Sequence, residues 1–220
     1  MRKSLLVCGC PRSGTMYISQ VLAHLGLQVG HMIMGEDGIV NFSLVGLGEY
    51  DDFQFASTEG IPEEGINEVV FDLIFHQVRH PVNAICSMMT MNDMKGFWEF
   101  VKNHIKLDLD DSTEEFLRLA EFWIKWNQKA EKMADWTYTV EDLSNSNGYL
   151  YREFCERLEV GSKPISCDKI PTTNSHRHLN NYPKIYWNNI YEKDPKMCEE
   201  MLEMMLKYGY TLHTCRGRAL

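Results

Sequence analysis

The stretch CGCPRSGTMY, residues 8 to 17, decides how we interpret this chain. Its two glycines have the spacing G-x-x-x-x-G, which occurs in loops that hold phosphate groups. In the loops that bind ATP with magnesium, the second glycine is followed by Lys and then by Ser or Thr. Thr15 and Met16 occupy those two positions here, and the cation is Arg12, inside the loop. Because methionine has no hydroxyl for magnesium, the stretch predicts an anion site that uses a fixed guanidinium and no metal.

The residues on either side predict a strand before this stretch and a helix after it. Residues 4 to 9, SLLVCG, form the short apolar run that is typical of a buried parallel strand. After the loop, apolar residues recur at helical spacing, namely Ile18, Val21, Leu22 and Leu25, and Gly26 can end the helix. A loop between a strand and a helix presents backbone N–H groups and the positive end of the helix dipole to an anion.

The remaining pattern predicts strands and helices in alternation. We expect further strands at residues 68 to 78 and 136 to 140, and helices after Pro81, from Phe116 to Met133, over residues 147 to 158 and from Asp194 to Gly209. Ser112 and Glu115 have the spacing of a capping box for the long helix, whose tryptophans we expect in the core. This alternation predicts an α/β fold with a mainly parallel sheet flanked by helices, and the length favours one domain, residues 1 to 220.

Composition narrows the class of protein. The chain is 44% hydrophobic and 24% charged, with a formal net charge of -9, so we expect no nucleic-acid partner. No apolar run is long enough to predict a membrane span. Seven cysteines without a CxxC motif predict reduced thiols and a cytoplasmic protein. Residues 13 to 78 contain no Lys or Arg, which fits either an irregular solvated insertion or a lid or acceptor-binding surface that disfavours polyanions.

Two motifs resemble the sulfotransferases that use 3′-phosphoadenosine 5′-phosphosulfate (PAPS) as donor. Residues 11 to 15, PRSGT, are similar to their 5′-phosphosulfate loop, and Arg79 with Ser87 eight residues later is similar to their 3′-phosphate motif. The blocks GHMIMGEDGIVNF, FHQVRHPVNAICSM, YTVEDL and TNSHRHLNNYPKIYWNNIYEKDP extend the resemblance to small bacterial-type members over nearly the whole chain. The resemblance implies a three-layer P-loop NTPase-like fold, with PAPS as donor and 3′,5′-ADP as product.

The resemblance also implies a set of donor-binding residues. These are Pro11, Arg12, Ser13, Gly14, Thr15 and Met16 in the loop, Arg79 and Ser87 after the second strand, and Ser175 and Arg177 in the polar loop near the C-terminus. Sulfuryl transfer then proceeds as an in-line displacement, with Arg12 and the loop amides stabilising the leaving oxygen.

The acceptor must lose a proton, so the mechanism also needs a base. His31 is the first candidate, because it follows the first helix and a short apolar strand, and Glu36 and Asp37 come next. His31 also fits a structural histidine, and the two carboxylates also fit turn residues. Met32 departs from the family pattern, in which an acidic residue often follows this histidine. The sequence therefore predicts a sulfotransferase acting on a hydroxyl or amine of a small molecule, sugar or peptide. The alternatives are a nucleotide-binding protein without catalysis and a P-loop kinase or hydrolase.

Overall fold

A computed structural model describes residues 4–42, 71–144, 148–164 and 183–211 of the chain. The chain divides into two compact units, each made of two segments. We call Met1–Val78 with Lys129–Asn174 the sheet unit, and Arg79–Gln128 with Ser175–Leu220 the helical unit. The expectation of a single domain over the whole chain stays a prediction.

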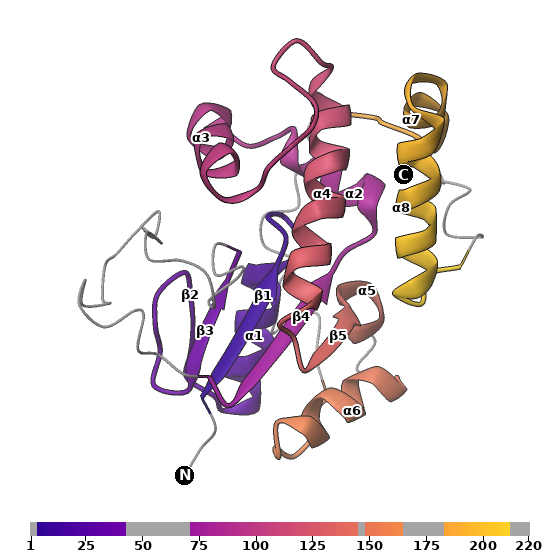
Figure 1. Ribbon diagram of the computed structural model, residues 1–220. Coiled ribbons are helices and arrows are strands. Elements are labelled where there is room, and N and C mark those ends of the chain that lie inside the picture. The colour runs from indigo at the N-terminus through magenta and orange to yellow at the C-terminus, as the bar shows by residue number, and fades with distance from the viewer. Residues whose placement is uncertain (1–3, 43–70, 145–147, 165–182, 212–220) are drawn as a thin grey trace. The chain divides into compact units, whose positions relative to one another are not determined.

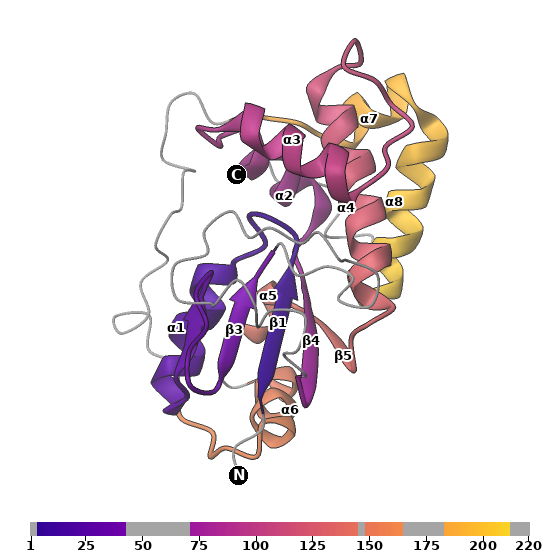
Figure 2. The same ribbon diagram turned by 60° about the vertical axis from the view of Figure 1, so that its left-hand side comes forward.

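The sheet unit contains a five-stranded sheet in which every strand runs parallel to its neighbours (Figure 1). The strands are β1 (Leu5–Gly9), β2 (Val29–His31), β3 (Gly38–Asn41), β4 (Leu73–Val78) and β5 (Trp136–Thr139). Their order across the sheet is β2-β3-β1-β4-β5, and Figure 2 shows β3, β1, β4 and β5 side by side. This confirms the predicted α/β class with a parallel sheet flanked by helices.

One face of the sheet is covered by helices of the same unit. They are α1 (Thr15–Leu25), the short α5 (Val140–Leu143) and α6 (Tyr149–Arg157). Their apolar side chains form one buried cluster with alternate residues of the strands, including Val7, Phe75 and Tyr138. The predicted helix after the loop is confirmed, since its apolar stripe is buried and Gly26 ends it in the left-handed conformation, with φ 92°.

The short apolar strand expected before His31 is β2, whereas the sequence did not reveal β3, which is also short and follows β2 closely. The first residue of β3 is Gly38, which has φ +133°, a conformation that L side chains rarely adopt. A Cβ at this position would lie 1.9 Å from the carbonyl oxygen of Leu5, because β3 pairs with β1 at this point. A glycine is therefore needed for β3 to pair at its first residue.

The helical unit is built from five helices in the described residues. They are α2 (Pro81–Met88), α3 (Met94–His104), α4 (Glu115–Glu131, whose last residues belong to the sheet unit), α7 (Trp187–Lys193) and α8 (Pro195–Lys207). The prediction that Trp123 and Trp126 are core residues is confirmed, because both are fully buried on α4. Pro81 begins α2 and Asp194 caps α8, as expected, whereas α3 and α7 were not predicted.

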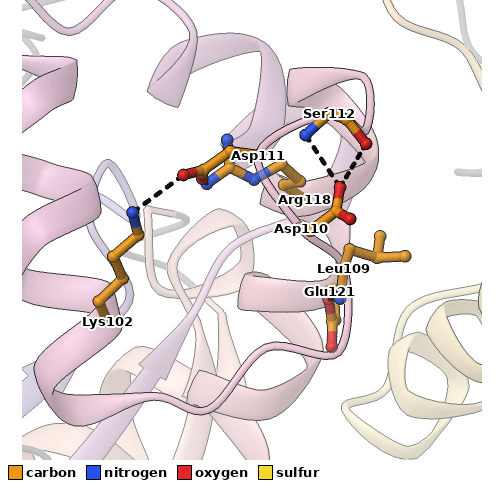
Figure 3. Close-up of polar contacts among 7 residues, drawn as sticks. All are labelled: Lys102, Leu109, Asp110, Asp111, Ser112, Arg118 and Glu121. Atoms are coloured by element: carbon orange, nitrogen blue, oxygen red, sulfur yellow. Dashed lines mark hydrogen bonds and ion pairs between the residues drawn. The ribbon is translucent and has the colours of Figure 1, made fainter.

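The segment between α3 and α4 is tied to α4 by charged side chains (Figure 3). Glu121 is buried and accepts the backbone N–H groups of Asp108 and Leu109 at 2.6 and 3.0 Å. Arg118 bonds the Asp111 carboxylate at 2.6 Å. The predicted capping box is wrong: the Ser112 hydroxyl donates to Asp110, and α4 begins only at Glu115. Because Glu115 is the first residue of the helix, Ser112 lies three residues before it, so neither residue occupies its position in a capping box.

In the parts of the chain that the structure describes, no helix is both long enough and apolar enough to cross a bilayer.

Candidate functional site

The glycine loop lies at the carboxyl edge of the parallel sheet, between the last residue of β1 and the first residue of α1. Two of its residues, Arg12 with φ 66° and Gly14 with φ 92°, have left-handed backbone conformations. The N–H of Ser13 donates to the carbonyl of Cys10 at 2.9 Å, which closes a tight turn. The carboxyl edge is where open α/β sheets bind ligands, so the loop stands where the sequence predicted an anion site.

The helix that follows the loop begins without a side-chain cap. Gly14 is its N-cap residue and has no side chain to accept the first N–H groups of α1. The first N–H groups of a helix have no partner inside the helix, and the dipole is positive at this end. The first turn of α1 therefore offers donors and positive potential to an anion held by the loop.

The space inside the loop depends on Gly9, the last residue of β1. A Cβ at Gly9 would lie 2.5 Å from the Ser13 hydroxyl oxygen and 3.3 Å from the Thr15 methyl. Ser13 is fully buried, and Pro11 is buried beside it in the chain. The absence of a side chain at Gly9 thus lets the loop fold back over the end of its own strand.

Two buried side chains that sequence reasoning missed hold this loop from the neighbouring strands. The Gln77 amide on β4 donates to the Ser13 carbonyl at 2.9 Å, and the Tyr138 hydroxyl on β5 donates to the Gln77 amide oxygen at 2.9 Å. The one sequence signal for this role was a glutamine next to the last residue of a strand whose other residues, apart from His76, are apolar.

His31, the first candidate base, and Thr15, a predicted donor-binding residue, are in contact in the sheet unit. His31 is the last residue of β2, and its Nε2 lies 3.1 Å from the Thr15 hydroxyl, at hydrogen-bond distance. Thr15 is the first residue of α1, so the imidazole lies at the start of the helix beside the loop. Burial lowers the pKa of His31 from its ordinary value of 6.5. The imidazole is therefore neutral at neutral pH and able to accept a proton.

Glu36 and Asp37 lie elsewhere in the sheet unit. The Asp37 carboxylate accepts the N–H of Gln28 at 2.6 Å, and its carbonyl accepts the N–H of Leu5 at 2.9 Å. Glu36 accepts the side-chain amide of Gln28. These contacts place both residues at the amino ends of β1 and β2, and the carboxyl end of β1 lies on the order of 13 Å away by strand geometry. The structure does not bring them to the loop, and it favours the turn-residue alternative.

Two methionines that the sequence analysis singled out, Met16 and Met32, have ordinary local roles. Met16 accepts the Ser19 hydroxyl on its backbone carbonyl within α1. Met32, where the family pattern has an acidic residue, has φ 62° and donates its N–H to the carbonyl of Val40. Neither side chain supplies a metal-binding oxygen.

The two residues of the predicted 3′-phosphate motif, Arg79 and Ser87, belong to the helical unit. Arg79 is half-buried and directly precedes His80, the N-cap residue of α2. Ser87 is buried in the last turn of α2, and its carbonyl accepts the Thr90 hydroxyl at 2.7 Å. Ser175 and Arg177 lie outside the described residues.

Within the described residues, no group of three or more His, Cys, Asp or Glu side chains is arranged to hold a metal ion. No protein-family model matches the chain, and a comparison with curated proteins finds no match.

Proposed function

We propose that this protein is a PAPS-dependent sulfotransferase with a three-layer P-loop-like fold. The observation that carries the proposal is the pairing of His31 with Thr15 at the first turn of α1. A neutral imidazole beside an anion-binding loop supplies the two functions that sulfuryl transfer needs, a base and a cradle for the charged group. The sequence resemblance supplies the identity of the anion.

The loop binds the sulfate end of the donor in this proposal. Backbone N–H groups at the start of α1 and the Arg12 guanidinium surround the transferring group and the oxygen that leaves with 3′,5′-ADP. Magnesium is not needed, because the leaving nucleotide is already stabilised by these fixed donors, and Met16 stands where a magnesium-binding hydroxyl would be. Arg79 and Ser87 bind the donor's 3′-phosphate, as the resemblance implies.

His31 takes the proton of the acceptor. A new S–O or S–N bond forms between the acceptor and the sulfuryl sulfur, while the bond from sulfur to the 5′-phosphate oxygen breaks. The acceptor proton moves to the imidazole, and the electron pair of the broken bond leaves with 3′,5′-ADP. Of the three candidate bases, His31 is the one whose contacts place it beside the loop.

The first experiment is isothermal titration with 3′,5′-ADP, with and without magnesium, beside ATP and AMP. We expect binding of 3′,5′-ADP that does not depend on magnesium and is roughly 10- to 100-fold weaker in Arg79→Ala, the effect of losing a hydrogen-bonded charge. Arg152, an exposed arginine on α6, provides the control variant Arg152→Ala with unchanged affinity. Preference for ATP with magnesium would refute the proposal and favour a P-loop kinase or hydrolase.

The second experiment separates an enzyme from a nucleotide-binding protein. The protein is mixed with PAPS and a panel of alcohols, sugars and peptides, and release of 3′,5′-ADP is followed. We expect turnover with at least one acceptor, lost in His31→Asn while 3′,5′-ADP still binds. Binding of the nucleotide without turnover on any acceptor would favour the non-catalytic alternative.

A further inference from the structure

Gln77 lies at the centre of a row of three residues on adjacent strands. Gly9 of β1, Gln77 of β4 and Tyr138 of β5 are paired in register at the carboxyl edge of the sheet. Gln77 is 0% exposed and Tyr138 2% exposed, so their polar atoms depend on protein partners. Both groups are satisfied by one chain of hydrogen bonds, from Tyr138 to Gln77 and from Gln77 to the carbonyl of Ser13.

This chain of hydrogen bonds fixes the orientation of the Gln77 amide. Burial raises the pKa of Tyr138 well above its ordinary value of 10.0, so its hydroxyl stays protonated and donates to the amide oxygen. If the amide turned over, its oxygen would face the Ser13 carbonyl oxygen, and two acceptors would meet in a buried place. The amide nitrogen therefore always points to Ser13.

The Ser13 carbonyl belongs to the same planar peptide as the N–H of Gly14. In a trans peptide the C=O and the N–H point in opposite directions, so holding one fixes the other. Gly14, with φ 92°, tolerates many backbone conformations, and this peptide could otherwise turn at little cost. By drawing the carbonyl toward β4, the Gln77 amide directs the Gly14 N–H away from that strand.

We propose that Gln77, oriented by Tyr138, is a positioning residue that fixes the Ser13–Gly14 peptide so that the Gly14 N–H faces the bound anion. The inference rests on the proposed function for the identity of that anion, the sulfate or 5′-phosphate end of the nucleotide. Gln77 itself does not touch the anion; it acts through the backbone of the loop.

The test compares Gln77→Met and Tyr138→Phe with a matched control. Thr137→Val removes a different side-chain pairing between β4 and β5, that of Thr137 with the buried His76 at 3.2 Å, one residue from the row. We expect 3′,5′-ADP to bind roughly 10- to 100-fold more weakly to Gln77→Met than to the wild type, which is the effect of one misplaced donor to a charged group. The loss of affinity in Tyr138→Phe should be smaller than in Gln77→Met. Thr137→Val should bind as the wild type does.

A second measurement does not depend on any ligand. The ¹H–¹⁵N resonance of Gly14 in the free protein reports the orientation of the Ser13–Gly14 peptide. It should move or broaden in Gln77→Met and keep its position in Thr137→Val. An unmoved Gly14 resonance would overturn the inference whatever the affinities. Suppose instead that the Gly14 resonance moves in Gln77→Met but the wild type does not bind 3′,5′-ADP. The role of Gln77 in fixing the Ser13–Gly14 peptide would then stand, and the proposed function would be refuted.

A third variant gives a pH dependence that a purely structural role for Gln77 does not predict. In Gln77→Glu the introduced carboxyl, when protonated, still donates to Ser13 and accepts from Tyr138. When ionised it has only acceptors and repels the Ser13 carbonyl. The ratio of the affinity of Gln77→Glu for 3′,5′-ADP to that of the wild type, measured at the same pH, should therefore be close to one at low pH and fall as pH rises. A constant ratio would contradict the inference, and this variant also serves if Gln77→Met does not fold.

Discussion

Gly38→Ala should destabilise the sheet unit and also disturb the candidate site. The new Cβ would lie 1.9 Å from the Leu5 carbonyl oxygen, and contacts under 3.0 Å are essentially never seen, so β3 must move by roughly 1 Å from β1. The φ of +133° adds strain for any residue with a side chain. His31 reaches its place through β3, because β2 pairs with no other strand among the described residues. Its contact with Thr15 should therefore weaken too.

The size of the effect follows from two contributions. Backbone strain of this kind costs about 1–3 kcal/mol. Weakening one or two hydrogen bonds at the first pair of the β1–β3 ladder costs about 0.5–1.5 kcal/mol each. We therefore expect the free energy of unfolding to fall by about 3 kcal/mol, measured by urea titration followed by circular dichroism, with an unchanged m value.

Three other glycines separate the two contributions. At Gly161 a Cβ meets nothing and φ is not positive, at Gly209 φ is +90° in open space, and at Gly30 a Cβ would lie 1.9 Å from the Ile33 carbonyl without a positive φ. Gly161→Ala should be neutral or slightly stabilising, Gly209→Ala should show the strain alone, and Gly30→Ala the contact alone. If Gly38→Ala cost no more than Gly209→Ala, the close approach of β3 to β1 would be refuted.

Three further predictions concern both units. Because burial lowers the pKa of His31, the unfolded chain binds a proton at this residue before the folded chain does, so stability should fall as pH drops below about 6.5 toward the folded pKa; an NMR titration locates that pKa, and His31→Asn should remove this part of the pH dependence. Glu121→Gln replaces one of the two oxygens that accept the N–H groups of Asp108 and Leu109 by an amide nitrogen, so the free energy of unfolding in urea should fall by about 2 kcal/mol. An unchanged free energy of unfolding would show that this carboxylate is solvated instead. Asp194→Ala removes the cap of α8 and should cost about 1 kcal/mol, whereas Asp194→Asn should restore most of it.

The sequence predicted the elements whose signal is local. The glycine loop, the apolar run before it and the helical stripe after it lie within 25 residues, and all three are where they were expected. The predicted strand at residues 68 to 78 is shorter in the structure, with β4 over Leu73–Val78 and residues 68 to 70 outside the described range. The alternation of strands and helices was enough for the fold class.

The parts that sequence reasoning missed depend on contacts between distant residues. Gln77 lies 64 residues from Ser13 and 61 from Tyr138, so no local pattern marks their hydrogen bonds. The choice among three candidate bases likewise needed the strand register, which puts His31 at the carboxyl ends of the strands and Asp37 at their amino ends. Short strands such as β2 carry too few residues for a period.

The row of Gly9, Gln77 and Tyr138 has a consequence for the order in which binding competence appears. The loop sequence is complete after the first 17 residues, yet its hydrogen-bonded support includes a strand that ends at residue 139. Closing such long loops is slow relative to forming local structure. A chain still being synthesised, or one in which β5 has detached, would have the loop sequence without the supported loop. Affinity for the proposed ligand, 3′,5′-ADP, would then report whether the sheet is complete.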